Sequence, residues 1–471
     1  MYNNFSISVS DDDSDDLIGR MRVRVRRRRR RLGFRAKNET FRQIRRIGQK
    51  WWSVLLFLSV MALILFQLPR TGVKPTEERK ADLDVGSELT NLSVAGGTEK
   101  PSNLNRLDQV TRVVSGVREP CLKLLPAEEL RHLEFPPIVA PDSPIRRIIY
   151  KGDFDETRIG GSGNALQEYT DGTRFNKFTG NQTFIERQES FKVSETAAVH
   201  CGFYSENGGF RISEEDKHFM RTCEAVVSTC AFGGGDDLYQ PIGMVEESLS
   251  KVCYVAFWDE ITKSAQEAQG KRIGADRMIG KWRIVVVRDL PFTDQRLNGK
   301  IPKLLSHRLF PQARYSIWVD SKSQLRRDPM GVLEALLWRT NSVFAISEHG
   351  ARSDVYNEGN AIVRKHKATP EEVEIQLTQY RRDGFPDDKR YRGKRALAEA
   401  SIIVREHTPS TNLFTCLWFN EVVRFTSRDQ LSFPYVLRQL GVLKINMFPV
   451  CTRKDLVNSM GHKRKVKPLT G

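Results

Sequence analysis

Five short apolar runs, separated by polar segments, constrain the fold of this 471-residue chain more than any other feature. They lie within the segments 223–237, 251–260, 281–290, 315–320 and 342–347. Between the third and fourth runs, residues 300–310 place their leucines at helical spacing. Continuous apolar strands that alternate with helices are typical of a mostly parallel sheet flanked by helices. We therefore expect an α/β fold.

Small and polar residues follow the expected strands, where α/β sheets bind ligands. Gly233, Gly234 and Gly235 follow the first run, and Asp259 ends the second. Glycines allow a nucleotide to approach the backbone, and Asp259 can accept hydrogen bonds from a base or ribose. A strand-to-helix turn and a helix N-cap explain the same residues without a ligand. Both interpretations stay open.

The fourth run, "YSIWVDSK", ends in Asp320 and is followed by Lys322. Asp320 can bind Mg²⁺ or Mn²⁺ with the help of a substrate diphosphate, since such ions need few protein ligands there. Lys322 would oppose a nearby cation, but it can neutralise a leaving diphosphate itself. Lys303, one helical turn after Lys300, can also reach a phosphate, although a solvated helix face is the simpler explanation. We predict that Asp320 is catalytic, with metal dependence left open.

Two further segments carry candidate side chains. His349 and Arg352 follow the fifth run and suggest a binding loop, which the start of a surface helix explains equally well. In residues 402–437, apolar positions alternate with polar ones. Trp418 offers a platform for a sugar ring, and Glu421 or Asp429 can act as a general base. Arg428 and Gln430 flank Asp429 as binding candidates, but Ser427 can also cap a helix there, which would give Asp429 a structural role.

The N-terminal part predicts membrane insertion. Residues 51–69 contain no charge and form a run long enough to span a bilayer as a helix. Fifteen Lys and Arg against six Asp and Glu in residues 1–50 indicate a basic cytosolic tail, so the rest of the chain would be lumenal. We expect a single-pass type II protein with a stem at 70–118, a domain at 119–460 and a basic tail at 461–471. This layout argues against nucleic-acid binding by the Arg run.

The seven cysteines all lie in the expected lumenal part, where an oxidising compartment permits disulfides. Their number is odd, so at least one thiol is free or pairs with another chain. Asn91 and Asn181 lie in glycosylation sequons. No C-x-x-C or H-E-x-x-H metal motif is present in the sequence.

Several segments together resemble the plant turgor-defect and mucilage-related family, which has a glycosyltransferase-like domain. The matching segments span about residues 120–460 and include "VHCGF", "WRIVVV", "NGKIPKLLSHRLFPQARYSIWVDSK", "LWRTNSVFAISEH", "REHTPSTNLFTCLWFNEVVRF" and "TSRDQLSF". The N-terminus and the ending "MFPVCTRKDLVNSMGH" look closest to the alkaline ceramidase branch of turgor regulation. The resemblance implies a GT-A-like nucleotide-sugar transferase fold, with Asp320 at the first acid of Asp-x-Asp and Lys322 in place of the second.

Three functions follow from this resemblance. The first is a Golgi enzyme that transfers a hexose from a nucleotide sugar to a glycan or lipid. The second, implied by the ceramidase branch, is hydrolysis of ceramide to sphingosine in the Golgi or endoplasmic reticulum. No G-x-S-x-G nucleophile motif is present to support that reaction. The third is a non-catalytic scaffold, for which Lys322 is the main sequence argument.

Overall fold

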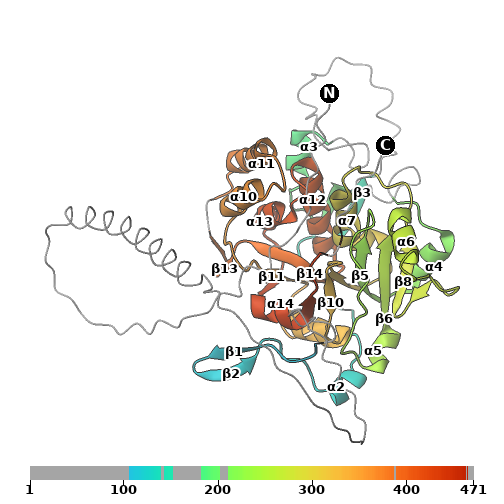
Figure 1. Cartoon of the computed structure of the whole chain (residues 1–471). Coiled ribbons are helices and arrows are strands. Elements are labelled where there is room, and N and C mark those ends of the chain that lie inside the picture. The colour runs from blue at the N-terminus through green and yellow to red at the C-terminus, as the bar shows by residue number, and fades with distance from the viewer. Residues whose placement is uncertain are drawn as a thin grey trace, which may run out of the picture. The chain divides into compact units, whose positions relative to one another are not determined.

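The computed structural model describes residues 106–138, 143–151, 182–201, 210–386, 389–462 and 464 (Figure 1). All of them belong to the compact unit formed by residues 1–17 and 101–471. Several predictions concern residues outside these ranges. They are the basic cytosolic tail at 1–50, the membrane anchor, most of the stem, and the sequons of Asn91 and Asn181. Within the described ranges, no helix combines the length and apolar character needed to cross a membrane.

An eight-stranded sheet forms the centre of the unit. All five predicted runs form strands of this sheet, which confirms that part of the sequence analysis. From one edge to the other, the order is β15 (Ile445–Phe448), β11 (Phe344–Glu348), β14 (Ala398–Glu406), β9 (Tyr315–Val319), β5 (Ala225–Ala231), β6 (Val252–Trp258), β8 (Trp282–Val286) and β7 (Met278–Ile279).

The sheet is mixed rather than parallel throughout. The strands β15, β11, β9, β5, β6 and β8 run in one direction. Strand β14 runs against both of its neighbours, and β7 runs against β8. Strand β14 was not predicted, because residues 402–437 were taken as one block of site residues. Its apolar run "IIV" is instead a central strand, inserted between two parallel ones.

Helices cover both faces of the sheet. Alternate residues of β5 enter different core clusters, since Val226 and Cys230 belong to one and Val227 and Ala231 to the other. The first cluster also takes apolar side chains from α7 (Gln295–Leu304), α10 (Val355–Arg364), α11 (Pro370–Arg382), α12 (Pro409–Arg424) and α13 (Asp429–Leu440). The second takes them from α9 (Pro329–Leu333), the π-helix η4 (Glu334–Trp338) and α14 (Val450–Leu456).

The remaining elements surround this sandwich. Figure 1 shows α4 and α6 beside β8, while α10, α11 and α13 gather near β11. The other helices of the described ranges are α2 (Ala127–Arg131), α3 (Phe184–Glu189), α4 (Glu214–Thr222), α5 (Glu246–Lys251), α6 (Glu260–Glu267) and α8 (Ser306–Leu309). Two-stranded sheets in these ranges pair β1 (Thr111–Val114) with β2 (Val117–Pro120), β3 (Arg147–Lys151) with β4 (Thr196–His200), β10 (Ser323–Leu325) with β16 (Val457–Ser459), and β12 (Arg390–Tyr391) with β13 (Lys394–Arg395).

Three disulfides tie distant parts of the chain together: Cys121–Cys451, Cys201–Cys416 and Cys223–Cys253. The seventh cysteine, Cys230, is a buried free thiol. The predicted odd thiol is therefore present inside the protein.

Candidate functional site

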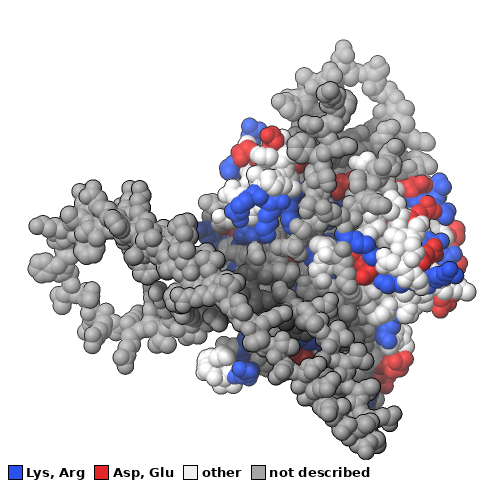
Figure 2. All heavy atoms as spheres, viewed as in Figure 1, with Lys and Arg blue, Asp and Glu red and all other residues white. Residues whose placement is uncertain are grey.

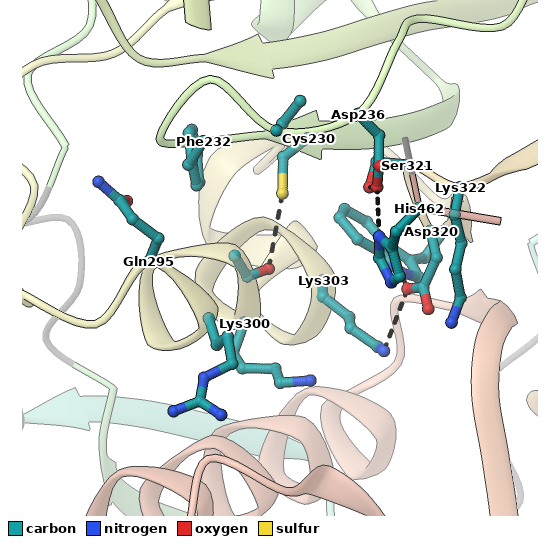
Figure 3. A pocket seen from close by; sticks show the side chains of 15 residues that line it. Cys230, Phe232, Asp236, Gln295, Lys300, Lys303, Asp320, Ser321, Lys322 and His462 are labelled. Atoms are coloured by element: carbon teal, nitrogen blue, oxygen red, sulfur yellow. Dashed lines mark hydrogen bonds and ion pairs between the residues drawn. The ribbon is translucent and has the colours of Figure 1, made fainter. Parts of the chain in front are cut away.

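The carboxyl ends of β5, β6, β9 and β11 meet at one edge of the sheet because these strands run in the same direction. A pocket opens at the β5–β9 part of this edge (Figure 3). We call it the α7 pocket, and its lining consists of Cys230, Ala231, Phe232, Gly235, Asp236, Gln295, Arg296, Gly299, Lys300, Lys303, Trp318, Asp320, Ser321, Lys322 and His462. The predicted residues Asp320, Lys303, Lys322 and Gly235 therefore come together.

Helix α7 supplies the largest share of this lining. It begins after Asp294, whose side chain accepts a hydrogen bond from the Arg296 N–H at 2.9 Å. The face with Leu297, Ile301 and Leu304 is buried in the core. The opposite face meets the pocket at five positions with helical spacing: Gln295, Arg296, Gly299, Lys300 and Lys303.

Two lysines and two aspartates form a chain of ion pairs at the α7 pocket, in which Asp429 is the member that does not line the pocket. The Lys303 Nζ lies 3.2 Å from Asp320 Oδ1 and 2.9 Å from Asp429 Oδ2. The Lys300 Nζ lies 2.9 Å from the same oxygen of Asp429. Asp320 Oδ1 also accepts a hydrogen bond from Trp318 Nε1 at 2.7 Å. The side chain of Asp320 is 25% exposed, against 6% for Lys303 and 2% for Asp429. Asp320 is therefore the solvent-exposed end of this series of ion pairs.

These contacts shift the pKa values of Asp429, Lys303 and Lys300. Burial raises the pKa of Asp429, but attraction to Lys300 and Lys303 outweighs it and holds this pKa well below its usual range. Burial lowers the pKa of Lys303, yet Asp320 and Asp429 together raise it above the usual value. Burial dominates at Lys300 and lowers its pKa in spite of Asp429. Asp429 therefore stays ionised as a counter-ion of two lysines, and its predicted role as a general base is wrong.

The turn after β9 presents Asp320 and Lys322 to the same pocket. The Asp320 N–H donates to the Ser401 carbonyl at 2.9 Å, and its carbonyl accepts from the Ser323 N–H at 2.9 Å. Lys322 lines the pocket from this turn, and Figure 3 shows its side chain extending beside Asp320. The site therefore has a cationic side chain where a second acid would complete an Asp-x-Asp pair.

The C-terminal segment closes one side of the pocket, a feature that the sequence analysis missed. Strand β16 pairs with β10, and the Met460 N–H donates to the Lys322 carbonyl at 2.8 Å. This pairing brings His462 into the lining, where its Nδ1 lies 2.8 Å from Asp236 Oδ2. The Ser321 hydroxyl donates to that same oxygen at 2.8 Å. From sequence, His462 was assigned to the basic tail at 461–471. Asp236 follows the predicted glycines and was given no role.

The glycine-rich turn does not present an open phosphate cradle. The Gly233 N–H donates to Asp259 Oδ2 at 2.9 Å, and the Gly234 N–H donates to Thr262 Oγ1 at 3.0 Å. The Gly235 N–H donates to the Phe232 carbonyl at 3.2 Å. Asp259 is only 3% exposed and also caps α6 through the Thr262 N–H. The predicted nucleotide contacts of Gly233, Gly234 and Asp259 are therefore not supported, and the helix-cap interpretation is correct.

Glu421 and Trp418 on α12 are structural residues instead of acceptor-binding ones. Both carboxylate oxygens of Glu421 accept hydrogen bonds from Arg187, at 2.6 and 3.0 Å, and the Glu421 side chain is 2% exposed. Trp418 is fully buried among aromatic side chains, so it cannot be a sugar platform. Its Nε1 donates to the Asp429 carbonyl at 3.0 Å. Both predicted roles are wrong.

The other candidate residues lie outside the α7 pocket lining. His349 is 1% exposed, and its Nδ1 accepts hydrogen bonds from the Ala351 and Arg352 N–H groups at 3.2 and 2.9 Å. Arg352 pairs with the buried Glu358. Arg428 and Gln430 flank Asp429 and are 4% and 7% exposed. His349 and Arg352 organise the loop after β11, while Arg428 adds to the charges that lower the pKa of Lys300.

The pocket does not fit a preformed divalent-cation site. Within the described residues, three possible ligands lie close enough together to hold a metal ion: Cys201, His307 and Cys416. Its two cysteines are bonded to each other, so they offer no thiolates. In the α7 pocket, Asp320 Oδ1 is occupied by Lys303 and Trp318. Asp236 is bonded to Ser321 and His462. Positive charge near Asp320 comes from lysine side chains.

A buried polar group behind the pocket supports the end of α7. Arg405, which is 1% exposed, donates to the carbonyls of Lys303 and Leu304 at 2.7 and 3.1 Å. His407 bridges the Ala313 carbonyl and the Ser316 hydroxyl, each at 2.8 Å. Burial lowers the pKa of His407 to about 3, and burial also holds the pKa of His307 well below its usual range.

We expect acid to destabilise the protein through these two histidines. The folded state keeps them neutral, whereas the unfolded chain protonates them below their ordinary pKa of about 6.5. Stability is therefore complete above pH 6.5 and falls as the pH drops toward 4, by about 1 kcal/mol per pH unit for each histidine. Urea unfolding at pH 7.5, 6 and 5 measures this loss. The variant His407→Gln should show a shallower dependence, and an unchanged slope would contradict the assignment to His407.

Comparison with known proteins agrees with the predicted family. The model of the family described as "TOD1/MUCI70, glycosyltransferase-like domain" matches residues 164–462. The chain is 40% identical over 297 residues to the probable hexosyltransferase MUCI70 of Arabidopsis thaliana, across 61% of this chain and 51% of that protein. It is 31% identical over 306 residues to the alkaline ceramidase TOD1 of the same plant, across 61% of this chain and 64% of that protein.

These matches qualify the sequence analysis in two ways. The chain spans about half the length of the first relative and less than two thirds of the second. The identity is higher to the hexosyltransferase relative, so the expected closeness to the ceramidase branch is wrong. Among solved structures, apo mouse xyloside xylosyltransferase 1 aligns with 9% identity and a TM-score of 0.27, over 47% of this chain and 84% of that chain.

Proposed function

We propose, from the premise that the chain belongs to the TOD1/MUCI70 glycosyltransferase-like domain family, that it transfers a hexose from a nucleotide sugar to a glycan acceptor. The observation that carries the proposal is the Lys303–Asp320 pair at the open end of the α7 pocket. In a GT-A-like sheet, the donor would bind at this edge, beyond the carboxyl ends of the strands. The name of the hexosyltransferase relative supports the choice of a hexose.

The lysines provide the charge that such a donor requires. A diphosphate in the α7 pocket would meet Lys303, Lys322 and Lys300, which line it from α7 and from the turn after β9. Cations fixed before the reaction stabilise the charge that develops on a leaving diphosphate. Asp429 holds Lys300 and Lys303 in position without facing the pocket itself. With Glu421 and Asp429 assigned to other roles, the carboxylates that line the pocket are Asp236 and Asp320.

We further propose that sugar transfer does not depend on a metal ion. The support is the arrangement around Asp320, where Lys322 takes the sequence position of a second acid and Lys303 occupies one oxygen of the Asp320 carboxylate. Mg²⁺ and Mn²⁺ prefer several oxygen ligands in regular geometry. A dependence on added Mn²⁺ would contradict this part of the proposal.

The cellular setting is also a proposal. Residues 51–69 would anchor the chain as a type II protein in the Golgi membrane, with the described unit in the lumen. Three disulfides within the described unit support an oxidising compartment.

The test is a transfer assay with the purified full-length chain, a panel of nucleotide sugars and plant glycan fractions, with either a chelator or Mn²⁺ present. We expect transfer with one donor, equal rates in both conditions, and loss of about 10²-fold or more in Asp320→Asn. The matched control is Asp289→Asn, because the Asp289 side chain is 61% exposed. Release of sphingosine from ceramide, with no transfer from any donor, would instead support the activity named for the second relative.

A further inference from the structure

The hairpin formed by β1 and β2 carries apolar side chains at its exposed end. Residues 112–118 read "RVVSGVR", and we call this segment the hairpin tip. All seven residues are exposed, and the valines Val113, Val117 and Val114 are 67%, 62% and 37% exposed. Single exposed valines are ordinary, whereas three around one turn form a contiguous apolar end. Figure 2 shows uncharged side chains at the end of this hairpin, with Lys or Arg side chains beside them.

The valines lie on both faces of the hairpin. Val113 is paired with Arg118 across the two strands, and Val114 is paired with Val117. Successive residues of a strand point to opposite faces, so Val113 lies on one face and the other two valines lie on the opposite face. A hairpin that packs against its own domain buries one face. The hairpin tip instead projects, and Figure 1 shows the hairpin extending away from α14.

The hairpin tip is held in one orientation. Ser115 and Gly116 have φ angles of 51° and 86°, as a tight two-residue turn between antiparallel strands requires. At the base of the hairpin, the Cys121 N–H donates to the Val110 carbonyl at 2.8 Å. The disulfide from Cys121 to Cys451 joins this base to α14. The tip therefore needs little further ordering when it contacts a partner.

Two arginines border the valines. Within the described part of the chain, the side chains of Arg112 and Arg118 form neither an ion pair nor a hydrogen bond. Guanidinium groups bind phosphate oxygens through paired hydrogen bonds. An apolar end with arginines directly behind it matches the order of groups in a phospholipid leaflet, where a layer of phosphates covers the acyl chains.

The sequence places a bilayer within reach of the hairpin. The expected membrane anchor ends at residue 69, and the 36 residues 70–105 separate it from the first described residue, Arg106. A chain of this length spans at most about 120–130 Å. An anchored chain would therefore present the hairpin tip to the membrane surface at a high effective concentration, where weak contacts are enough for docking.

The base of the hairpin is connected to the α7 pocket through β16. The Asn458 side chain of this strand donates from Nδ2 to the Arg106 carbonyl at 3.1 Å. The same strand leads to Met460 and His462, which close one side of the pocket. Docking of the hairpin tip would therefore hold the pocket in a fixed orientation to the membrane.

We propose that the hairpin tip docks on a phospholipid surface. Val113, Val114 and Val117 enter the boundary between headgroups and acyl chains, while Arg112 and Arg118 bind lipid phosphates. This inference goes beyond sugar transfer and uses the proposed anchor only to bring a bilayer close.

The test places a fluorescent label on the hairpin tip of the full-length chain. Val113→Cys supplies an accessible thiol, whereas Cys230 is buried and the other six cysteines form disulfides. The labelled chain is inserted into phosphatidylcholine nanodiscs that contain a nitroxide-labelled lipid. We expect loss of about half or more of the emission, because docked side chains lie about 5–10 Å into the headgroup and acyl boundary. The matched control is Ile185→Cys on α3, which is 71% exposed and should keep its emission.

Second changes in the labelled chain separate the two chemical contributions. Val114→Ser/Val117→Ser should lower the ratio of quenched to unquenched label at least about tenfold, because two valines no longer enter the boundary. Arg112→Gln/Arg118→Gln should lower this ratio about two- to fivefold, with part restored in Arg112→Lys/Arg118→Lys. All four side chains are exposed, so urea unfolding should stay as in the wild type.

Three results would overturn the inference. The first is an absence of quenching at Val113→Cys, and the second is equal quenching at Ile185→Cys. The third is cross-linking of two chains through Val113→Cys without quenching by the nitroxide lipid, which would make the hairpin tip an interface between copies. A chain that does not insert is mixed with vesicles of the same lipids. Quenching of the tip label there supports docking without the anchor, and its absence contradicts docking.

Discussion

Replacing Lys303 by Met is expected to reduce sugar transfer by about 10²–10³-fold, which corresponds to about 3–4 kcal/mol of transition-state stabilisation. The Lys303 ammonium is the group that contacts both Asp320 and Asp429. Without it, Asp320 faces the pocket without its counter-ion and repels the diphosphate of the donor. The steady-state rate constant kcat and the donor KM, measured for purified wild type and variant, give this loss.

The neighbouring lysine provides the control for that variant. Lys300→Met removes a cation from the same face of α7 and from the same Asp429 oxygen, but it leaves the contact between Lys303 and Asp320. We expect a smaller loss of activity than in Lys303→Met. Equal losses in the two variants would show that only the total charge matters, and full activity of Lys303→Met would remove the α7 pocket from the mechanism.

Replacing Glu421 by Leu is expected to lower the free energy of unfolding by about 3–5 kcal/mol. Glu421 accepts two hydrogen bonds from Arg187, and both side chains are 2% exposed. Its loss leaves Arg187 with Asp383, at 2.9 Å, as the remaining partner in a buried setting. Burial lowers the pKa of Arg187, but Glu421 and Asp383 outweigh it and hold this pKa well above its usual value, so Arg187 is charged in the folded protein. Urea unfolding measures the change.

Activity distinguishes this structural role from the general-base role expected from sequence. The folded fraction of Glu421→Leu should keep the kcat of the wild type, because Glu421 does not line the α7 pocket. An exposed pair supplies the control, since Glu374→Gln removes a carboxylate that is 68% exposed beside Arg381 and should leave unfolding unchanged. A catalytic loss in fully folded Glu421→Leu would restore the original assignment.

Sequence patterns predicted the strands well because burial on both faces leaves a continuous apolar run. They did not separate β14 from the helix that follows it, because the whole block 402–437 was taken as one set of site residues, although the polar stretch 405–412 divides its apolar residues. The direction of β14 could not be predicted from sequence either, because an antiparallel strand buried on both faces has the same composition as a parallel one.

Residues of the pocket lining could be predicted from sequence where charged side chains come directly after an apolar strand. Asp320 and Lys322 belong to one turn, and Lys303 lies on α7, which comes before β9 in the chain. Glu421 and Trp418 misled the analysis because a polar group beside apolar residues has the same sequence pattern whether it faces a ligand or a buried partner. His462 could not be found, because only the pairing of β16 with β10 brings it to Asp236.

Calorimetric titration of the full-length chain with UDP and GDP in the presence of a chelator tests the central claim most directly. The account predicts that wild type binds one of these nucleotides, and that Lys303→Met binds it at least about tenfold more weakly. Arg288→Gln, an exposed change near β8, should bind like the wild type. Equal affinity of wild type and Lys303→Met, or binding that requires added Mn²⁺, would contradict a lysine-based diphosphate site in the α7 pocket.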